Sequence, residues 1–491
     1  MREAVRPFLR TRTLPFVLAA GLALAPLLPP HEAAARPVPD SFADLVEQVS
    51  PAVVQIVSRT EAVSSRSTGD EDSMDRSQRD LLERFFGQRM APERQGPRMG
   101  LGSGFIVSSD GVIVTNNHVV GDADRIDVRL RDGREFKAEL IGTDPQTDLA
   151  VLRIHADGPL PVLAWGNSDA ARVGDWVVAV GNPYGLSGTV TAGIVSSRGR
   201  DTDASPYVDF LQIDAPLNSG NSGGPLLDSN GQVIGVNTAI LSPNPNGGSV
   251  GIGFAIPSDT AKKIVADLRE NGKVDRGWLG VAIQPVSPDI ADSLGLKGAA
   301  GALVATVAPD SPAARSGVRQ GDVILAIDGQ KVATPRELSR AVADTKTGTR
   351  TVLTVWRGDR ELPLKVSVGA MPDSGKTVAA NHSEPAKGKS TKNDGAVELA
   401  ALGLRLGLMP APDEGDGMRV VVTAVDDDAD AADKGIRPGD FILKVNDADV
   451  TTPKEVSKIL DRARSEHRNA VLLLIENQEG QRFVPVKLVS A

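Results

Sequence analysis

The sequence predicts a mainly-β protein, with a domain of short strands followed by two copies of a smaller α+β unit. Between residues 41 and 258, short apolar runs alternate with turns rich in Gly, Asn, Asp and Ser. Such a series is typical of β-sandwiches and β-barrels. After residue 258, one stretch of sequence recurs at a constant spacing, and each copy is followed by a helix signal. The 491 residues suffice for about three domains of ordinary size.

The strands of the first domain are predicted from apolar runs bounded by turn residues. The run over 125–130 alternates apolar with charged side chains, as a strand with one buried face does. Two runs separated by 108–111 predict a hairpin over 104–115. Further strands are expected over 52–57, 148–154 and 176–180. A helix is then expected over 259–268, capped by Ser258 or Asp259.

The repeat is seen most clearly in two glycine-rich stretches. Gly317–Leu325 resembles Gly435–Leu443 at an offset of 118 residues. The same offset relates Asp322 to Asp440 and Pro335 to Pro453. Each of these prolines opens a helix pattern, and proline suits the first turn of a helix.

Composition excludes several classes of site. The net charge of −9 and the absence of a basic stripe with interleaved aromatics argue against nucleic acid as a partner. The chain has no cysteine, which excludes disulfides, thiol nucleophiles and thiolate metal sites. Its five histidines share no close ligand spacing, so we expect no metal and no cofactor.

Residues 1–35 have the features of an export signal. Arg2, Arg6, Arg10 and Arg12 precede an apolar run over 14–28, and Ala33–Ala35 offers a cleavage site. The alternative is a retained membrane anchor, but the run is short for a span of about 20 residues and is interrupted by proline. We expect cleavage, no membrane span in the mature chain, and export to the periplasm or beyond the cell envelope.

Two segments interrupt the series of predicted elements. Residues 63–99 are rich in Ser, Asp, Glu and Arg, yet Leu81, Leu82, Phe85 and Phe86 fall at helical spacing. They predict either a surface loop or an element that docks on another subunit. Residues 371–396 contain almost no large apolar side chains and are expected to be a flexible linker.

Three motifs together indicate nucleophilic catalysis. His118 follows an apolar strand, Asp148 precedes another, and Ser222 lies in the sequence Gly220-Asn221-Ser222-Gly223-Gly224-Pro225. A serine flanked by glycines can expose its hydroxyl on a tight turn, where neighbouring N–H groups converge on one point. Each motif is weak alone, but the order His, Asp, Ser is one of the known orders of a catalytic triad.

At this point the sequence resembles the HtrA (Deg) family of trypsin-like serine proteases that carry C-terminal PDZ domains. The resemblance rests on the three motifs, on both repeats and on 102–105, 181–185 and 251–257. It implies a trypsin-like double β-barrel followed by two α+β PDZ domains. The implied division is a signal peptide over 1–35, a protease domain over 36–270 with 63–99 as an inserted loop, PDZ domains over 271–370 and 397–491, and the linker over 371–396.

The resemblance also implies roles for the three residues. Ser222 would attack the scissile carbonyl, His118 would take and return the proton, and Asp148 would orient the imidazole. The N–H groups of Gly220 and Ser222, with Asn221 between them, would form the oxyanion hole. Relatives commonly carry threonine and alanine at the positions of Ile213 and Pro216, and proline or arginine at Ser219.

Substrate and regulatory residues are implied in the same way. The segment Asn237, Thr238, Ala239, Ile240 and Leu241 would line the primary specificity pocket, which would favour a small aliphatic residue because no acidic residue is present. Arg200 lies in a segment that resembles the family's sensor loop, and the alternative is an ordinary solvated arginine.

Peptide recognition is expected in the repeats. Trp278, Leu279, Gly280 and Val281 would form the loop that captures a C-terminal carboxylate, with Arg405–Leu408 as the counterpart in the second repeat. The alternative for each repeat is a folded spacer.

The expected function is ATP-independent degradation of unfolded or misfolded envelope proteins, in protein quality control under stress. The chain contains no P-loop. The resemblance implies a homo-oligomer, a trimer or a multiple of it. Two alternatives are a chaperone-like scaffold with silent proteolysis and regulated cleavage of a single signalling substrate.

Overall fold

The computed structural model describes eleven stretches of the chain and one single residue between two of them. These are residues 40–60, 98–121, 123–182, 188–200, 205–218, 220–240, 249–372, 397–410, 418–466, 468, 470–477 and 480–488. The predicted export signal and the residues Leu81, Leu82, Phe85 and Phe86 lie outside these stretches, as does nearly all of the predicted linker.

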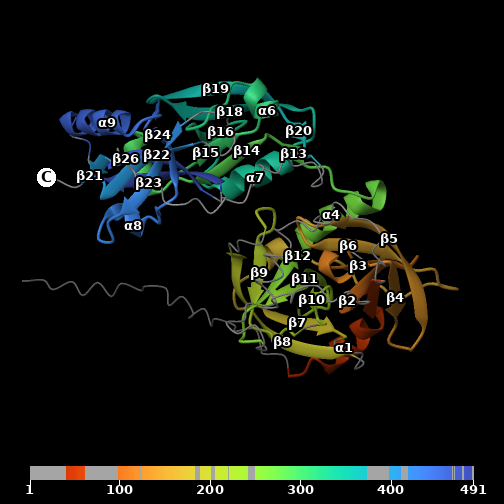
Figure 1. The fold of residues 1–491 in the computed structure, drawn as a ribbon. Helices are drawn as coiled ribbons and strands as arrows, with labels where there is room; N and C mark the ends of the chain where they lie inside the picture. Colours follow the sequence, from red (N-terminus) through yellow and green to blue (C-terminus); the bar gives the residue numbers. More distant parts are fainter. Residues whose placement is uncertain are drawn as a thin grey trace, which may run out of the picture. The chain divides into compact units, whose positions relative to one another are not determined.

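A closed six-stranded barrel follows a short N-terminal helix, α1 (Ala43–Val49), and a 3-10 turn, η1 (Ser50–Ala52). Its strands pair in the order β1-β2-β3-β6-β5-β4, and the helix α3 (Asn117–Val120) follows β3. Figure 1 labels β2, β3, β4, β5 and β6 of this barrel. The strands are β1 (Val53–Thr60), β2 (Arg98–Ser108), β3 (Val112–Thr115), β4 (Arg125–Arg129), β5 (Glu135–Asp144) and β6 (Leu149–Arg153). The predicted hairpin is the antiparallel pair β2–β3.

A second closed barrel has the order β10-β11-β12-β9-β8-β7 and is preceded by the 3-10 turn η2 (Ser168–Ala170). Its strands are β7 (Trp176–Gly181), β8 (Thr189–Arg200), β9 (Phe210–Ile213), β10 (Pro225–Leu227), β11 (Val233–Ile240) and β12 (Gly253–Pro257). The expected double-barrel architecture is therefore confirmed. Ile213 is fully buried in the core of this barrel.

Each barrel core is filled by alternate residues of its own strands, because successive side chains of a strand point to opposite faces. Ile56, Ile113 and Leu152 are fully buried in the first core, and Val177, Ile213 and Leu226 in the second. Burying side chains of this size contributes about 1.5–3 kcal/mol each, which makes these cores the main source of stability.

The helix α4 (Ser258–Asn271) packs on strands of both barrels. The predicted cap is wrong, because the helix is preceded by Pro257 without a side-chain cap. Ser258 instead donates its hydroxyl to the carbonyl of Gly166 at 3.0 Å. The first turn is therefore fixed by tertiary contacts rather than by a local cap.

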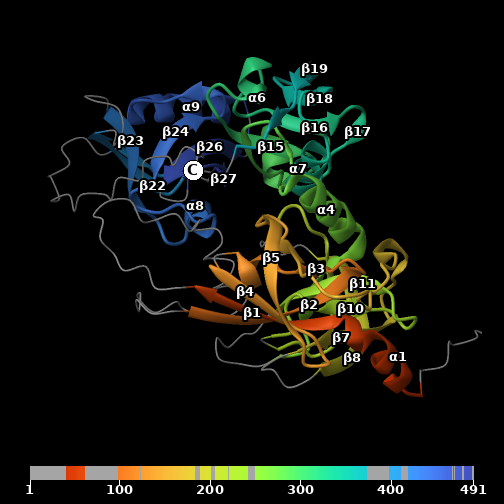
Figure 2. The same ribbon diagram turned by 90° about the vertical axis from the view of Figure 1, so that its right-hand side faces the viewer.

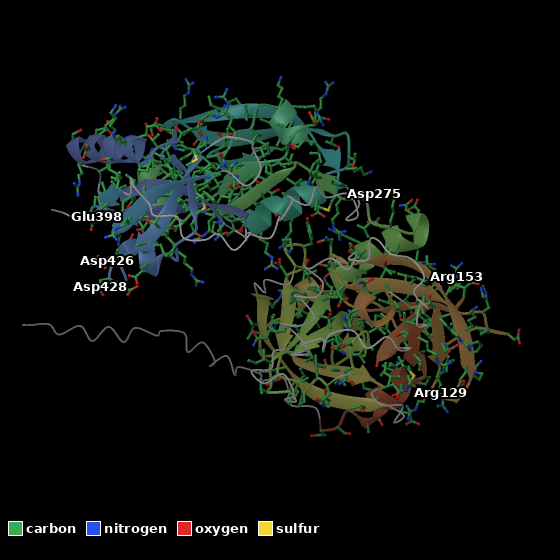
Figure 3. All side chains as sticks on the ribbon, viewed as in Figure 1. Arg129, Arg153, Asp275, Glu398, Asp426 and Asp428 are labelled. Carbon is green, nitrogen blue, oxygen red and sulfur yellow. The ribbon has the colours of Figure 1, made fainter. Side chains whose placement is uncertain are left out.

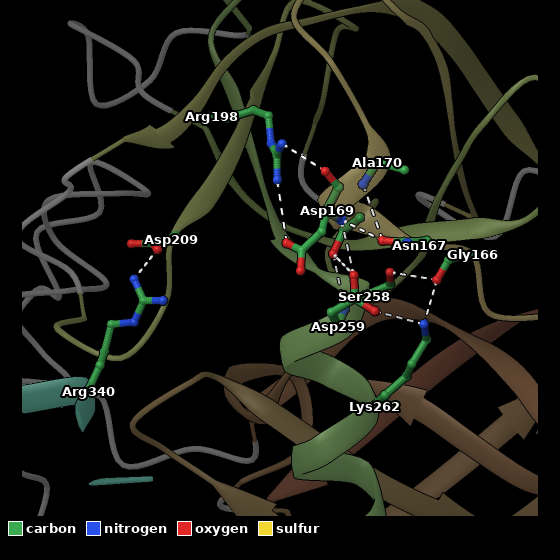
Figure 4. A network of polar contacts seen from close by, with 11 residues as sticks. Gly166, Asn167, Asp169, Ala170, Arg198, Asp209, Ser258, Asp259, Lys262 and Arg340 are labelled. Atoms are coloured by element: carbon green, nitrogen blue, oxygen red, sulfur yellow. Dashed lines mark hydrogen bonds and ion pairs between the residues drawn. The ribbon is translucent and has the colours of Figure 1, made fainter. Parts of the chain in front are cut away.

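Polar contacts hold Asp259 at the start of α4 (Figure 4). Its carboxylate accepts hydrogen bonds from Ser168 Oγ at 2.8 Å and from Lys262 Nζ at 2.8 Å. Burial would raise the pKa of Asp259, but the hydrogen bonds from Lys262, Ser168 and the Asp169 N–H outweigh it and lower the pKa to about 2. The same picture shows Arg198 paired with Asp169 and Arg340 paired with Asp209.

The first repeat has a sheet of order β14-β15-β16-β18-β19, in which β14 is an edge strand. Its terminal strands, β13 (Gly277–Trp278) and β20 (Gly369–Ala370), pair with each other. The remaining elements are β14 (Val281–Pro285), α5 (Pro288–Ser293), β15 (Ala302–Val307), α6 (Pro312–Arg315), β16 (Val323–Ile327), β17 (Gln330–Lys331), α7 (Pro335–Ala343), β18 (Arg350–Arg357) and β19 (Arg360–Ser367).

The second repeat has the order β21-β22-β23-β24-β26-β27, with one more strand, β21, at the edge. Figure 2 labels β22, β23, β24, β26 and β27 of this sheet. Its elements are β21 (Val397–Leu399), β22 (Leu404–Pro410), β23 (Met418–Val425), α8 (Asp430–Asp433), β24 (Phe441–Val445), β25 (Ala448–Asp449), α9 (Pro453–Ser465), β26 (Ala470–Asn477) and β27 (Gly480–Lys487). The predicted helices begin at Pro335 and Pro453, and each is capped by the preceding threonine side chain. Within the stretches described, no helix is long and apolar enough to cross a membrane.

Candidate active site

His118 and Asp148 form a hydrogen-bonded pair at one end of the first barrel. The Nδ1 atom of His118 lies 2.7 Å from one carboxylate oxygen of Asp148, and the His118 backbone N–H donates to the other at 2.9 Å. Both side chains are mostly buried, with 16% and 17% of their surface exposed. His118 lies in the short helix α3, three residues beyond the end of β3, the strand that it was expected to follow.

Asp148 has an unusual backbone conformation that its neighbours hold in place. Its φ of 56° is in the left-handed region, which is uncommon for a residue with a side chain. Its carbonyl accepts hydrogen bonds from Asn116 Nδ2 at 2.8 Å and from the Asn117 N–H at 3.1 Å. The residues that precede His118 in the chain therefore also fix the turn that carries Asp148.

Ser222 lies on the loop between β9 and β10, and β11 supports this loop. Its hydroxyl donates to the carbonyl of Thr238 at 3.3 Å. The next N–H, of Gly223, donates to the Asn237 carbonyl at 2.8 Å. Gly223 has a φ of 84°, and a Cβ there would lie 2.2 Å from the Ser103 carbonyl oxygen. The tight turn around Ser222 thus depends on the glycine that follows it.

Thr238 connects the loop that carries Ser222 to the His118–Asp148 pair. Its hydroxyl donates to the carboxylate of Asp148 at 2.7 Å, to the same oxygen that faces His118. Its carbonyl accepts from Ser222. Thr238 was expected only as a pocket residue. The structure gives it a second contact that no local sequence signal indicates, because Thr238 and Asp148 are 90 residues apart.

The predicted oxyanion loop presents two N–H groups. Gly220 has a φ of 100°, and its carbonyl accepts the Ser103 hydroxyl at 2.5 Å. Among the described hydrogen bonds, neither the Gly220 N–H nor the Ser222 N–H donates to a protein group. Asn221 lies between them and is 2% exposed. Two donors, one residue apart and without a described acceptor, suit the stabilisation of a developing negative charge beside the Ser222 hydroxyl.

Ser103 joins three parts of the site. It donates its hydroxyl to the Gly220 carbonyl, accepts from the Asn182 N–H at 2.7 Å, and donates its own N–H to the Ser222 carbonyl at 2.9 Å. Ser103 is fully buried on β2 of the first barrel. Ser103 lies in the stretch 102–105, and a serine between two glycines is the one sequence signal that points to this role.

A buried ion pair lies beside the turn that carries Asp148. The guanidinium of Arg276 donates to both oxygens of Asp144, at 2.7 and 2.5 Å, and the side chains are 8% and 3% exposed. Thr147, which precedes Asp148, also donates to Asp144. The Arg276 guanidinium lies 5.0 Å from the ring centre of Tyr207. Burial raises the pKa of the Tyr207 hydroxyl, although Arg276 opposes the shift.

The remaining predicted residues are placed less completely. Asn237 is fully buried on β11, and its side chain donates to the Pro225 carbonyl at 3.0 Å. Ala239 and Ile240 continue the same strand, and Leu241 lies outside the described residues. Arg200 is the last residue of β8, opposite Phe210, and the structure does not describe its side chain.

The predicted carboxylate loop of the first repeat lies between β13 and β14. The carbonyls of Leu279 and Gly280 accept hydrogen bonds from Ala313 at 2.9 Å and Ala308 at 2.8 Å. Because C=O and N–H point in opposite directions across a trans peptide, the N–H groups of Gly280 and Val281 face away from these partners. Successive N–H groups on one side of a loop suit an anion.

The predicted counterpart in the second repeat is wrong. Arg405–Leu408 lies inside the strand β22 and is not a loop. The structural counterpart of Gly280 is Gly403, and both have a positive φ. A Cβ on Gly280 would meet Ser311, and a Cβ on Gly403 would meet Ala429, which lies at the position equivalent to Ser311. The two repeats differ in length here, because the segment from Gly403 to Gly435 is shorter than the corresponding segment from Gly280 to Gly317. A constant offset therefore does not locate the loop of the second repeat.

Comparisons with known protein families agree with this organisation. Residues 102–236 match the trypsin-like peptidase domain, and residues 277–368 and 421–474 each match a PDZ domain. The first match includes His118, Asp148 and Ser222.

Relatives and solved structures point the same way. The chain is 47% identical over 474 residues to a probable periplasmic serine endoprotease, DegP-like, of Brucella suis, covering 91% of this chain and 89% of the relative. It is 43% identical over 476 residues to the same type of protein from Rhizobium meliloti, covering 92% of each. It also resembles the structure of the HtrA-type protease AlgW with decapeptide, with a TM-score of 0.57, 42% identity, and coverage of 68% of this chain and 99% of that one.

Proposed function

The chain belongs to the family of DegP-like serine endoproteases of the HtrA type, and we propose that it cleaves peptide bonds through an acyl-enzyme formed on Ser222. In this mechanism the Ser222 oxygen attacks the scissile carbonyl as His118 takes its proton. His118 then returns that proton to the leaving amine, and water releases the acyl group. Asp148 fixes the imidazole through its 2.7 Å contact and stabilises the imidazolium that forms.

The oxyanion hole of this proposal consists of the N–H groups of Gly220 and Ser222. Both lack a described protein acceptor, and both flank Asn221 on a loop whose Gly220 carbonyl is turned toward Ser103. A donor pair of this kind contributes about 3 kcal/mol per donor to the stabilisation of the tetrahedral intermediate.

Thr238 and Ser103 act as positioning residues. Thr238 holds the Asp148 carboxylate from the side opposite the His118 backbone, and Ser103 holds the Gly220 carbonyl. Neither touches the atoms that react. Their effect is to keep the three proposed catalytic groups and the oxyanion donors in one arrangement.

We further propose that the substrates are unfolded or misfolded envelope proteins, degraded without ATP after export to the periplasm and removal of residues 1–35. The protease domain would span 36–270, with a pocket at Asn237–Leu241 that favours small aliphatic residues. Relatives are named periplasmic, which supports the location. Assembly into a trimer or its multiples belongs to the same proposal.

The first repeat, over 271–370, would bind C-terminal peptides. Its edge strand β14 is unpaired on one side among the described strands, and its loop from Trp278 to Val281 directs N–H groups to one face. A peptide would add to β14 as a further strand, with its carboxylate at the loop. Arg200 would link this event to the loop that carries Ser222.

The observation that carries the proposal is the chain of contacts Ser222–Thr238–Asp148–His118, which draws together residues from three distant motifs. Digestion of unfolded casein by the wild-type chain and by Ser222→Ala tests it. Wild type should cut casein at several sites and Ser222→Ala at none, with unchanged circular dichroism. Binding of casein without cleavage by the wild-type chain would instead support a silent scaffold.

Peptide docking needs its own test in the Ser222→Ala background. A fluorescent decapeptide that copies residues 390–399 and ends in a free carboxylate should bind, and its C-terminal amide should bind at least about tenfold more weakly, since loss of a charge-assisted contact costs more than 1.4 kcal/mol. Equal binding of the two forms would contradict capture of the carboxylate.

A further inference from the structure

The two repeats share a fold but differ at the strand edge where a peptide would add. In the first repeat, β14 ends its sheet, and the preceding strand β13 pairs with β20 instead. In the second repeat, β22 corresponds to β14, and β21 lies along its outer edge. The position that is open in the first repeat is therefore filled in the second by the chain itself.

The filling strand runs in the direction of a docked peptide. Val397, Glu398 and Leu399 pair antiparallel with Leu406, Arg405 and Leu404 of β22. The segment reaches the loop at its C-terminal end, as a peptide does when it presents its carboxylate there. The chain then turns through 400–403 and continues as β22.

The loop N–H groups are also taken. Leu402 and Gly403 correspond to Leu279 and Gly280, and they donate to the carbonyls of Leu399 at 2.9 Å and Ala400 at 3.3 Å. In the first repeat, neither corresponding N–H donates to another described residue. The carbonyls of Leu399, the last residue of β21, and of Ala400 thus engage N–H groups of this loop, and the Gly403 N–H is the counterpart of the Gly280 N–H that would face a C-terminal carboxylate.

Side-chain burial shows the same difference. Leu404 and Leu406 of β22 are 1% and 0% exposed, whereas the corresponding Val281 and Ile283 of β14 are only half-buried. Leu399 is 6% exposed within the core of the second repeat, and Val397 packs against that core. The intervening Glu398 is exposed, as the alternation of a strand requires (Figure 3). The helix α9 contacts both β21 and β22.

We infer that the segment Val397–Leu399 is the intramolecular ligand of the second repeat, so that C-terminal peptides dock on the first repeat alone. Three backbone and two side-chain positions of a peptide are supplied in cis, at a very high effective concentration because the connecting turn is short. A free peptide must therefore displace β21 before it can use the second groove. The part of this inference that concerns the first repeat rests on the peptide docking proposed above.

Hydrogen exchange in the full chain carrying Ser222→Ala tests the inference, with the carboxylate-ended decapeptide of residues 390–399 as probe. Without peptide, amides over 404–406 should exchange at least about tenfold more slowly than those over 281–283. Saturating peptide should slow exchange over 281–283 and leave 404–406 unchanged. Equally fast exchange of both edges in the free chain, or slowing of 404–406 by peptide, would overturn the inference.

Two variants give an independent readout by binding stoichiometry. Val397→Pro removes the backbone donor of β21 at the position paired with Leu406, and should raise binding from one to two peptides per chain, with Val397→Ala as the control that stays at one. The chain lacks cysteine, so Glu398→Cys with Arg405→Cys can form a single disulfide across the paired strands. This double variant should bind one peptide per chain both before and after oxidation. Binding of two peptides by the reduced form, falling to one on oxidation, would contradict the inference.

Failure of the proposed docking is distinguishable from failure of this inference. If the first repeat shows neither binding nor slowed exchange, peptide docking there is wrong. Slow exchange over 404–406 in the free chain would still support the filled edge. Catalysis plays no part in either readout because Ser222 is absent.

Discussion

The first barrel supplies His118 and Asp148 as a pair joined by hydrogen bonds of 2.7 and 2.9 Å, whereas the second supplies Ser222 on a loop with one hydroxyl contact of 3.3 Å. Asp148 accepts further bonds from Asn116, Asn117 and Thr238. The His118–Asp148 pair is thus held mainly by contacts within the first barrel, with one further contact from Thr238 of the second. The proposed nucleophile depends on a glycine-rich loop whose supports come from both barrels.

Substitutions in the two barrels should therefore affect activity in different ways. Changes in the first barrel should alter proton transfer while leaving the Ser222 loop in place. Changes at Ser103, which joins the first barrel to the Gly220 carbonyl, should alter the oxyanion loop while leaving the His118–Asp148 pair in place. The following variants separate these effects, beginning with the largest.

Removal of the nucleophile gives the largest expected effect. Ser222→Ala should lower kcat for a peptide substrate by about 10⁶-fold, because residual catalysis then comes from the oxyanion hole and binding alone. Steady-state cleavage of a fluorogenic peptide measures this, with KM unchanged. Retention of more than about 1% of activity would show that another group is the nucleophile.

Neutralisation of the first-barrel carboxylate comes next. Asp148→Asn should lower kcat by about 10⁴-fold, because the amide would hold the imidazole in the wrong tautomer. Asp127→Asn, on strand β4 of the same barrel, is the matched control and should keep its activity. An equal loss in both variants would indicate a general effect on the first barrel.

Loss of the buried ion pair between Arg276 and Asp144 should lower the free energy of unfolding. Arg276→Met leaves the Asp144 carboxylate buried without its partner and should destabilise the protein by about 3–5 kcal/mol. Urea unfolding followed by tryptophan fluorescence measures this. Arg276→Met combined with Asp144→Leu should recover much of the loss, whereas additive losses would argue against a coupled pair.

Removal of the bridge between barrels should affect the oxyanion loop selectively. Ser103→Ala deletes the contact with the Gly220 carbonyl and should lower kcat by about 10²-fold, the effect of losing one oxyanion donor. The exposed Ser109→Ala on the same hairpin is the control. Unchanged kcat in Ser103→Ala would contradict the positioning role.

The smallest expected effect is the pH dependence at α4. Because the pKa of Asp259 is about 2 in the folded chain against 3.8 otherwise, its contribution is present above pH 4 and is lost as pH falls toward 2. The side chain is 33% exposed, so solvent screening keeps the contribution below about 1 kcal/mol. Asp259→Asn should be slightly less stable than wild type at pH 7 and equal to it near pH 2. A constant difference over this range would exclude the linkage.

Much of the fold could be predicted because it depends on local patterns. Apolar runs predicted the strands β1, β4, β6 and β7, and the offset of 118 residues predicted paired helices at Pro335 and Pro453. The three motifs of the site were also local, since each combines a reactive residue with turn residues beside it.

What could not be predicted depends on contacts between distant residues. Ser103 reaches Gly220 across 117 residues, and Thr238 reaches Asp148 across 90. Ser258 has the sequence of a cap but bonds to Gly166 instead. The filled edge of the second repeat escaped prediction because Val397–Leu399 follows a segment that reads as a linker, and only the register with β22 reveals it.

Labelling with a fluorophosphonate tests whether Ser222 is a nucleophile activated by His118 and Asp148. Mass spectrometry of the wild-type chain should find one adduct per chain, on Ser222. The labelling rate should fall by about 10⁴-fold in Asp148→Asn, and labelling should disappear in His118→Ala. An adduct on another residue, or labelling of Ser222 in His118→Ala at the wild-type rate, would contradict the account.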